Sequence, residues 1–249
     1  MEWRGTDGVR WLEARLPRAR VAFSARSGGV SEVPFESLNL GILTEDAPDS
    51  VVENRRRLAL ALGLTPEQVA IGRQVHGAEL ATHTDPQAGV PFANPGGEIP
   101  GVDGHVIFES GLAALVFVAD CLPVALAGPG GVAILHCGWR GLAGGIVARG
   151  AAAVDATDAA IGPGIGRCCY EVGEEVLDSF AGLGDGIASG QMLDLAEVAH
   201  RLLREAGVNR IEMAGLCTSC EVELFFSHRR DAGKTGRQAG LAWLDSKEA

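Results

Sequence analysis

Short apolar runs bounded by glycine, proline and charged residues recur along the chain, and this pattern predicts β-strands. The predicted strands cover residues 20–26, 68–75, 104–108, 114–119, 123–127, 132–136 and 210–216. Four of them follow one another closely in the middle of the chain, with no room for a helix between them. This order disfavours a strictly alternating parallel sheet and favours an α+β fold with mixed sheets.

Apolar residues at helical spacing predict helices over residues 49–63, 170–180 and 194–207. In the first helix, Ser50 and Glu53 have the spacing of a capping box, and Gly63 is a typical stop. The third begins near Asp194 and ends at Gly207. No repeat, low-complexity segment or linker divides the sequence, so residues 1–249 are expected to form a single domain.

Composition narrows the classes of function. The formal net charge of −11 argues against a nucleic-acid partner and against an anionic membrane surface. The longest apolar tract, residues 111–128, is interrupted by Asp120 and Pro123, which argues against a membrane span. Six cysteines without an apolar leader segment indicate free thiols in a reducing compartment, so we expect a cytoplasmic protein. The oligomeric state is not determined at this level, and a monomer is compatible with the sequence.

Candidate chemistry gathers around the stretch AILHCGWRGLAGG, residues 133–145. The preceding GPGG motif is a strong turn signal and predicts a β-hairpin between its flanking apolar runs. A turn centred on this motif places His136 opposite Pro123, with Cys121 two residues further along on the same face. Diagonal cross-strand neighbours lie about 7–8 Å apart, close enough to share a metal or a proton. The two residues form either a functional pair or two satisfied structural residues.

A catalytic zinc site uses three protein ligands and leaves one position open. His76, which ends the strand-like run of RQVHG, is the candidate third ligand. The other histidines are in less suitable settings; they are His83, His105, His200 and His228. Asp120 is a candidate proton carrier beside Cys121, although a carboxylate in such a turn is often structural.

The remaining cysteines give weaker signals. Cys217 and Cys220 form a lone Cys-x-x-Cys motif without a second pair, so a zinc ribbon is not indicated. We expect them to be buried structural thiols. The adjacent Cys168 and Cys169 are expected to be core and loop residues rather than ligands.

Basic residues are informative in an acidic chain. Four of them lie within ten residues near the C-terminus: Arg229, Arg230, Lys234 and Arg237. Two or more of these are expected to form local ion pairs, and Arg229 and Arg237 are candidate ligands for an anion, together with Arg26 and Arg140. Trp139 is expected to pack behind His136.

Seven motifs occur in an order that resembles the YfiH family. They are FSARSGGVSEVPFESLNLG, VVENRRRLALALG, RQVHG, VADCLPVALA, HCGWRGLAGG, IGPGIGRCCYEVG and CTSCEVELFFSHRRDAGKTGRQ. The resemblance extends over about residues 20–245 and implies a four-layer α/β/β/α sandwich. It also implies one zinc ion held by His76, Cys121 and His136. Cys137 stands where the family usually has alanine, which adds a thiol and removes no expected ligand.

The family has carried two functional labels, multicopper polyphenol oxidase (laccase domain) and purine nucleoside phosphorylase. The chain has six histidines and no His-x-His pair, so the donors suit one zinc ion better than a multicopper cluster. The resemblance then implies phosphorolysis of adenosine, inosine and methylthioadenosine, with adenosine deamination. Some members are described as peptidoglycan-editing factors, so a Cys–His or zinc amidase acting on UDP-muramyl-amino acid precursors is the alternative. A zinc-stabilised binding module with Cys137 as fourth ligand is a third possibility.

Overall fold

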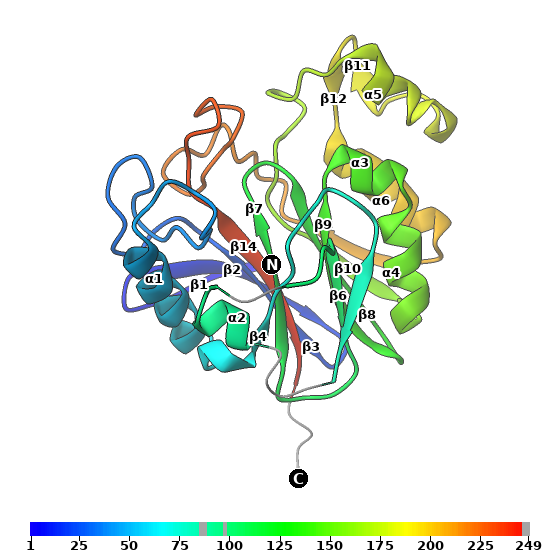
Figure 1. The fold of residues 1–249 in the computed structure, drawn as a ribbon. Helices are drawn as coiled ribbons and strands as arrows, with labels where there is room; N and C mark the ends of the chain where they lie inside the picture. Colours follow the sequence, from blue (N-terminus) through cyan, green and yellow to red (C-terminus); the bar gives the residue numbers. More distant parts are fainter. Residues whose placement is uncertain (85–88, 97–98, 246–249) are drawn as a thin grey trace.

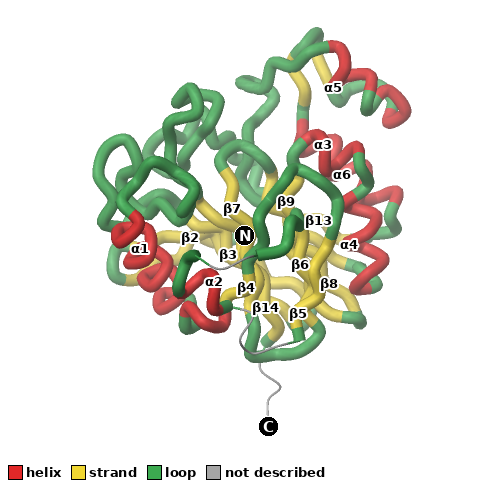
Figure 2. Tube along the Cα trace, viewed as in Figure 1, coloured by secondary structure: helices red, strands yellow, loops and turns green. Residues whose placement is uncertain are grey.

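The computed structural model describes residues 1–84, 89–96 and 99–245. Two six-stranded sheets pack face to face, and helices cover the outer face of each sheet (Figure 1). Helices α1 and α2 lie on one side of the sheet pair, and α3, α4 and α6 lie on the other (Figure 2). The predicted α+β class and the four-layer α/β/β/α order are therefore confirmed.

The first sheet has the strand order β1-β2-β3-β14-β7-β4. Its only parallel pair among the described strands is β4 with β7, and the other neighbours are antiparallel. The bounds are β1 Glu2–Thr6, β2 Val9–Leu16, β3 Ala19–Ser24, β14 Gln238–Leu244, β7 Ala113–Val118 and β4 Val69–Ala70.

The second sheet has the order β13-β10-β8-β9-β6-β5, with parallel pairs at both edges. The bounds are β13 Arg210–Met213, β10 Asp158–Ile161, β8 Leu122–Gly128, β9 Gly131–Cys137, β6 Gly104–Ile107 and β5 Leu80–His83. A small separate ladder joins β11 (Ala188–Ser189) to β12 (Met192–Leu193). The helices are α1 Pro48–Ala61, α2 Val90–Ala93, α3 Trp139–Ala143, α4 Ile146–Val154, α5 Glu174–Asp178 and α6 Leu195–Glu205, with 3₁₀ turns at Pro66–Gln68 and Ala181–Leu183.

Three buried clusters correspond to the three interfaces between the layers. One cluster lies between the sheets and includes Phe23, Val116 and Ile134. A second packs the outer face of the second sheet against α4 and α6, and a third packs the first sheet against α1. Strands β8 and β9 are buried along their whole length, because both faces of their sheet are covered. This explains why their sequences are continuous apolar runs rather than alternating ones.

Most predicted elements are confirmed, and the differences have local causes. Helix α6 begins at Leu195 with Asp194 as its cap, since the carboxylate accepts the Glu197 N–H at 3.0 Å. Helix α1 has no Ser50 cap, because Pro48 opens the helix two residues earlier. The predicted run 68–75 forms strand only at Val69–Ala70.

The N-terminal strands β1 and β2 were not predicted from the sequence. Charged side chains interrupt their apolar pattern, and every residue of β1 is exposed.

No helix in the described part of the chain is long and apolar enough to cross a membrane.

Candidate metal and catalytic site

The candidate site lies where the chain passes from one sheet to the other. Strand β7 belongs to the first sheet and β8 to the second, and the three residues between them include Asp120 and Cys121. His76 lies in a second such connection, between β4 and β5. Both turns need unusual backbone, with a φ of +96° at Asp120 and +60° at His76. The two connections between the sheets thus supply His76 and Cys121.

The β8–β9 hairpin has the register that the GPGG turn predicts. Pro123 pairs with His136, so Cys121 lies diagonally beside this histidine. The ligand atoms of His76, Cys121 and His136 all lie within 4.8 Å of one another. The two imidazole rings meet edge to face, with 4.9 Å between their centroids. These three residues form a candidate metal-binding site.

Gly138 explains part of the HCGW motif. A Cβ atom at this position would lie 3.0 Å from Cys121 Sγ and 3.3 Å from His76 Cδ2. Glycine therefore allows the backbone after His136 to approach the other two candidate ligands closely.

Asp103 is a central residue of the site that sequence reasoning missed. Its buried carboxylate lies 2.7 Å from His136 Nδ1. The same carboxylate accepts the backbone N–H groups of Val75, His76 and Gly77 at 2.8–3.0 Å. Asp103 thus orients one candidate ligand and holds the loop of another, as carboxylates behind metal-binding histidines do.

The four groups form a strongly coupled charge network. Burial raises the pKa of the Cys121 thiol, but His136 and His76 together lower it by more than burial raises it, and the resulting pKa is about 6. Burial lowers the pKa of His136, whereas Cys121 and Asp103 raise it to about 9. Burial raises the pKa of Asp103, and its hydrogen bonds from His136 and the loop amides bring it below the usual value. The arrangement favours a thiolate, which is the form of cysteine that binds metals or acts as a nucleophile.

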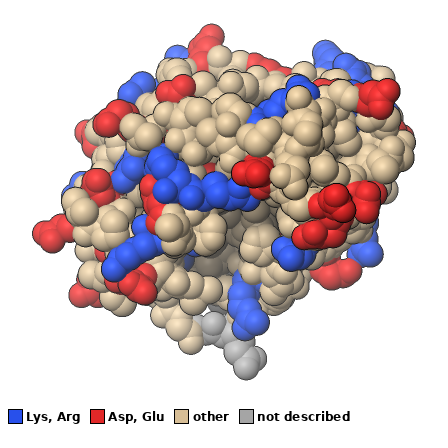
Figure 3. Space-filling view, turned by 90° about the horizontal axis from the view of Figure 1, so that it is seen from above, with Lys and Arg blue, Asp and Glu red and all other residues tan. Residues whose placement is uncertain are grey.

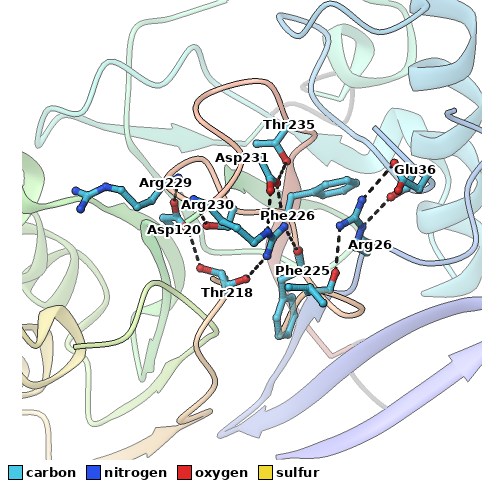
Figure 4. Close-up of polar contacts among 12 residues, drawn as sticks. Arg26, Glu36, Asp120, Thr218, Phe225, Phe226, Arg229, Arg230, Asp231 and Thr235 are labelled. Atoms are coloured by element: carbon cyan, nitrogen blue, oxygen red, sulfur yellow. Dashed lines mark hydrogen bonds and ion pairs between the residues drawn. The ribbon is translucent and has the colours of Figure 1, made fainter. Parts of the chain in front are cut away.

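Asp120 is an anchor for the surrounding loops (Figure 4). One carboxylate oxygen accepts the Thr218 hydroxyl at 2.7 Å, and the other accepts the Arg229 backbone N–H at 2.7 Å. Its carbonyl oxygen accepts the Ile165 N–H at 2.8 Å. With both carboxylate oxygens engaged, Asp120 has a structural role that accounts for its position beside Cys121.

Two of the predicted anion ligands lie around Tyr170, a second residue that the sequence did not single out. Burial and the charges of Cys121 and Asp120 raise the pKa of Tyr170 to about 12, against the opposing effect of Arg229 and Arg140. The guanidinium of Arg229 lies 5.3 Å from the Tyr170 ring centroid and donates to the Glu171 carbonyl at 2.9 Å. Arg140 is exposed and stacks on Trp139 at 4.4 Å.

The other predicted anion ligands differ in how far their guanidinium groups are engaged. Arg26 donates to the carbonyls of Glu36 and Val222, pairs with the Glu36 carboxylate at 3.4 Å and lies over Phe226 (Figure 4). Arg237 donates through Nη1 to two neighbouring carbonyls and lines a hollow of about 320 Å³. Its role and that of Arg26 in binding an anion stay predictions.

Arg230 and Lys234 form local ion pairs, as expected for part of this basic segment. Arg230 pairs with Asp231 at 2.7 Å, and Lys234 with Glu45 at 3.3 Å. Viewed from above, the molecule shows Lys and Arg side chains bordering a hollow in this face (Figure 3).

The cysteines outside the site correct two expectations. Cys137 points to the opposite side of β9 from His136 and is packed in the core beneath α4, and the three-residue cluster does not include it. Cys217 is half-buried and Cys220 is exposed, so the expectation that these two are buried structural thiols was wrong. Cys168 is exposed and Cys169 half-buried, so neither is the expected core residue. These four cysteines instead lie together.

Comparison with known proteins places this geometry in a family. Residues 20–245 match the family described as multi-copper polyphenol oxidoreductase laccase. Purine nucleoside phosphorylase YlmD of Geobacillus stearothermophilus is 38% identical over 262 residues, covering 96% of this chain and 95% of the relative. Purine nucleoside phosphorylase YfiH of Escherichia coli is 37% identical over 235 residues, covering 89% and 92%.

Solved structures agree with the sequence relatives. The crystal structure of Bacillus licheniformis hypothetical protein YfiH has a TM-score of 0.89 and 32% identity, covering 98% of this chain and 99% of that one. The crystal structure of YlmD from Geobacillus stearothermophilus has a TM-score of 0.88 and 36% identity, covering 98% of both chains. The chain therefore belongs to the YfiH family, whose members the family description calls multi-copper polyphenol oxidoreductase laccases.

Proposed function

We propose that the chain is a zinc-dependent purine nucleoside phosphorylase that also deaminates adenosine. Its substrates are adenosine, inosine and methylthioadenosine, and its phosphorolysis products are the free base and the corresponding (methylthio)ribose 1-phosphate. The observation that carries the proposal is the convergence of His76, Cys121 and His136, with the exposed Arg140 and Arg229 around the neighbouring Tyr170. The choice of a purine nucleoside and phosphate as substrates rests on the relatives that are named purine nucleoside phosphorylase.

The donor set supports zinc rather than the copper of the family description. One thiolate and two imidazoles are favoured zinc ligands, and Asp103 stands behind His136 as the orienting carboxylate. A multicopper oxidase centre needs many more histidines than the six in this chain. A zinc ion held by these three ligands would supply Lewis acidity for the reaction.

The chain's own residues account for the handling of phosphate. A chain of net charge −11 repels phosphate unless cationic side chains gather at the site, and we place Arg229, Arg140 and Arg237 in that role. They hold hydrogen phosphate against C1′, where one phosphate oxygen bonds to C1′ as the bond from C1′ to the base breaks, and the proton of the hydrogen phosphate ends on the departing base. Tyr170 remains protonated at neutral pH and serves as a hydrogen-bond donor within this charged surface. Arg26 joins the phosphate ligands only by exchanging its Glu36 contact for the anion.

One arrangement favours the amidase alternative. Cys121, His136 and Asp103 lie in the order of a nucleophile, a base and an orienting carboxylate. In that reaction the thiolate attacks an amide carbonyl of a UDP-muramyl-amino acid, His136 protonates the leaving amine, and water then hydrolyses the thioester to release the acid and restore Cys121.

Product analysis separates the two functions. Adenosine and inosine are incubated with the purified protein over a series of phosphate concentrations, and base, ribose 1-phosphate and inosine are quantified. We expect base release that rises with phosphate, and ammonia release from adenosine that does not require it. Inert nucleosides together with turnover of a muramyl amide would instead establish the amidase.

A further inference from the structure

Four cysteines outside the candidate site form a second cluster. The sulfur atoms of Cys168, Cys169, Cys217 and Cys220 all lie within 4.8 Å of one another. Cys220 Sγ is 3.5 Å from both Cys168 Sγ and Cys169 Sγ. Because Cys168 and Cys220 are exposed, burial in a core does not explain why thiols occur here.

Strand pairing brings these two pairs of cysteines together. Strands β10 and β13 are parallel neighbours, so the loops that follow them leave the sheet at the same edge. The loops stay in contact beyond the strands, where Gly164 bridges to Cys217 and accepts the Thr218 N–H at 2.9 Å. Each loop then turns, with Cys169 N–H donating to the Gly166 carbonyl and Cys220 N–H to the Cys217 carbonyl. Each turn presents two thiols to the other loop.

The size and chemistry of the cluster fit a single thiolate-bound metal ion. A zinc–sulfur distance of about 2.3 Å gives a tetrahedron whose sulfurs are about 3.8 Å apart. The separations here, from 3.5 Å to at most 4.8 Å, enclose one ion rather than the several irons of an iron–sulfur cluster. The Gly166 N–H also donates to Cys217 Sγ at 3.1 Å, which is the kind of contact that supports a metal-bound thiolate.

We propose that Cys168, Cys169, Cys217 and Cys220 form a second zinc site, closed by four sulfur ligands and structural in character. Its consequence follows from the neighbouring residues. Thr218, next to Cys217, donates to the Asp120 carboxylate, and Tyr170 and Glu171, beyond Cys169, contact Arg229. A metal ion that joins the two loops would thereby also fix the residues around the first site that these loops contact, Asp120 and Arg229.

Metal analysis of the intact protein, purified under reducing conditions, tests the second site. We expect about two zinc ions per wild-type chain. The double variant Cys168→Ser/Cys220→Ser should retain only the first, and Cys121→Ala only the second. Cys137→Ala is the matched control, because it removes a cysteine from outside both clusters and should keep both ions. One zinc in the wild type and an unchanged content in Cys168→Ser/Cys220→Ser would overturn the proposal.

Spectroscopy identifies the ligands. The metal-free Cys121→Ala variant, titrated with Co²⁺ alone, should develop sulfur-to-cobalt charge-transfer absorption and the visible bands of a tetrahedral all-thiolate site. These bands should be missing when Cys168→Ser and Cys220→Ser are added. Intact-mass analysis without reductant checks the competing chemistry: stable disulfides among the four cysteines of freshly isolated protein would overturn the metal assignment.

Hydrogen exchange tests whether a metal ion holds the two cysteine-containing loops together. In Cys168→Ser/Cys220→Ser, amides of residues 162–171 and 214–224 should exchange about tenfold faster or more, because opening of these loops is no longer opposed by the ion. Amides of α1, which lies on the other side of the sandwich, should be unaffected. Unchanged exchange in both loops would show that no ion holds them.

Discussion

The two cysteine-containing clusters differ in composition, surroundings and chemistry. The first has two imidazoles and one thiol as candidate ligands and carries Asp103 behind His136. The second has four thiols, two of them exposed, and no titratable group of another kind among its candidate ligands. A three-ligand site is suited to binding substrate, whereas a four-ligand site is closed to it. We therefore propose the catalytic role for the three-residue cluster and the structural role for the four-cysteine cluster on the number of their candidate ligands.

Their positions in the fold agree with this division. In the first cluster, His76 and Cys121 lie in connections between the two sheets, and His136 lies at the end of β9, so its geometry depends on how the two sheets pack. The second joins two loops at one edge of a single sheet. Loss of the first should affect chemistry, and loss of the second should affect the order of the loops.

Cys121→Ala should have the largest effect on activity. Removing a zinc ligand and the only thiol of the first site should lower kcat/KM for inosine by about a thousandfold or more, since metal stabilisation amounts to several kcal/mol. Thermal unfolding should remain cooperative, because the fold does not depend on this ligand. Steady-state kinetics and calorimetry are the measurements. Normal turnover by this variant would remove both the zinc-ligand role and the nucleophile role of Cys121.

Asp103→Asn should weaken the first metal site selectively. The amide cannot accept the three loop N–H groups and the His136 contact together, so zinc affinity should fall about 10- to 100-fold. Competition with a chromophoric chelator measures both sites. The affinity of the four-cysteine site should not change, and equal weakening of both would contradict their independence.

Arg237→Ala should raise the phosphate requirement. Loss of one charged hydrogen-bonding contact costs on the order of 1.5–3 kcal/mol, which corresponds to about a ten- to hundredfold increase in KM for phosphate. Adenosine deamination, which uses no phosphate, should change much less. Arg56→Ala is the matched control, because this exposed side chain is paired with Glu53 on α1 and does not line the hollow of Arg237. Equal loss of both reactions in Arg237→Ala would exclude a specific role in phosphate binding.

The smallest effect concerns two histidines that have no thiol partner. His83 Nε2 lies 2.9 Å from His105 Nδ1, and burial lowers the pKa of His105 to about 3. Below pH 6.5, the ordinary pKa of histidine, His105 takes up a proton in the unfolded chain, whereas in the folded chain it stays neutral down to about pH 3. This difference in proton binding lowers the stability of the fold as the pH falls from 6.5 to about 3. Above pH 6.5 it contributes nothing. NMR should show a neutral His105 ring at pH 5; a protonated ring would contradict this assignment.

Much of the first site was predictable because it is encoded locally. The GPGG turn determines the hairpin register, and the register places Cys121 beside His136 over a few residues of chain. The apolar runs of β8 and β9 likewise predicted their strands, since burial of both faces requires them. His76 was reached from the sequence by its ligand type and by family resemblance, not by geometry.

The contacts of Asp103 and the meeting of the four cysteines were decided by the tertiary structure, because they depend on which distant segments become neighbours. Asp103 acts through a loop 26–28 residues earlier in the chain and a strand 33 residues later, and neither distance leaves a local pattern. The two pairs of cysteines are separated by 51 or 52 residues where they meet, so the sequence presented them as unrelated. Only the parallel pairing of β10 with β13 brings their loops to the same edge. Residue types and short-range register are thus determined by the sequence itself, whereas the ligand sets that span distant loops arise from the order of strands in the folded sheets.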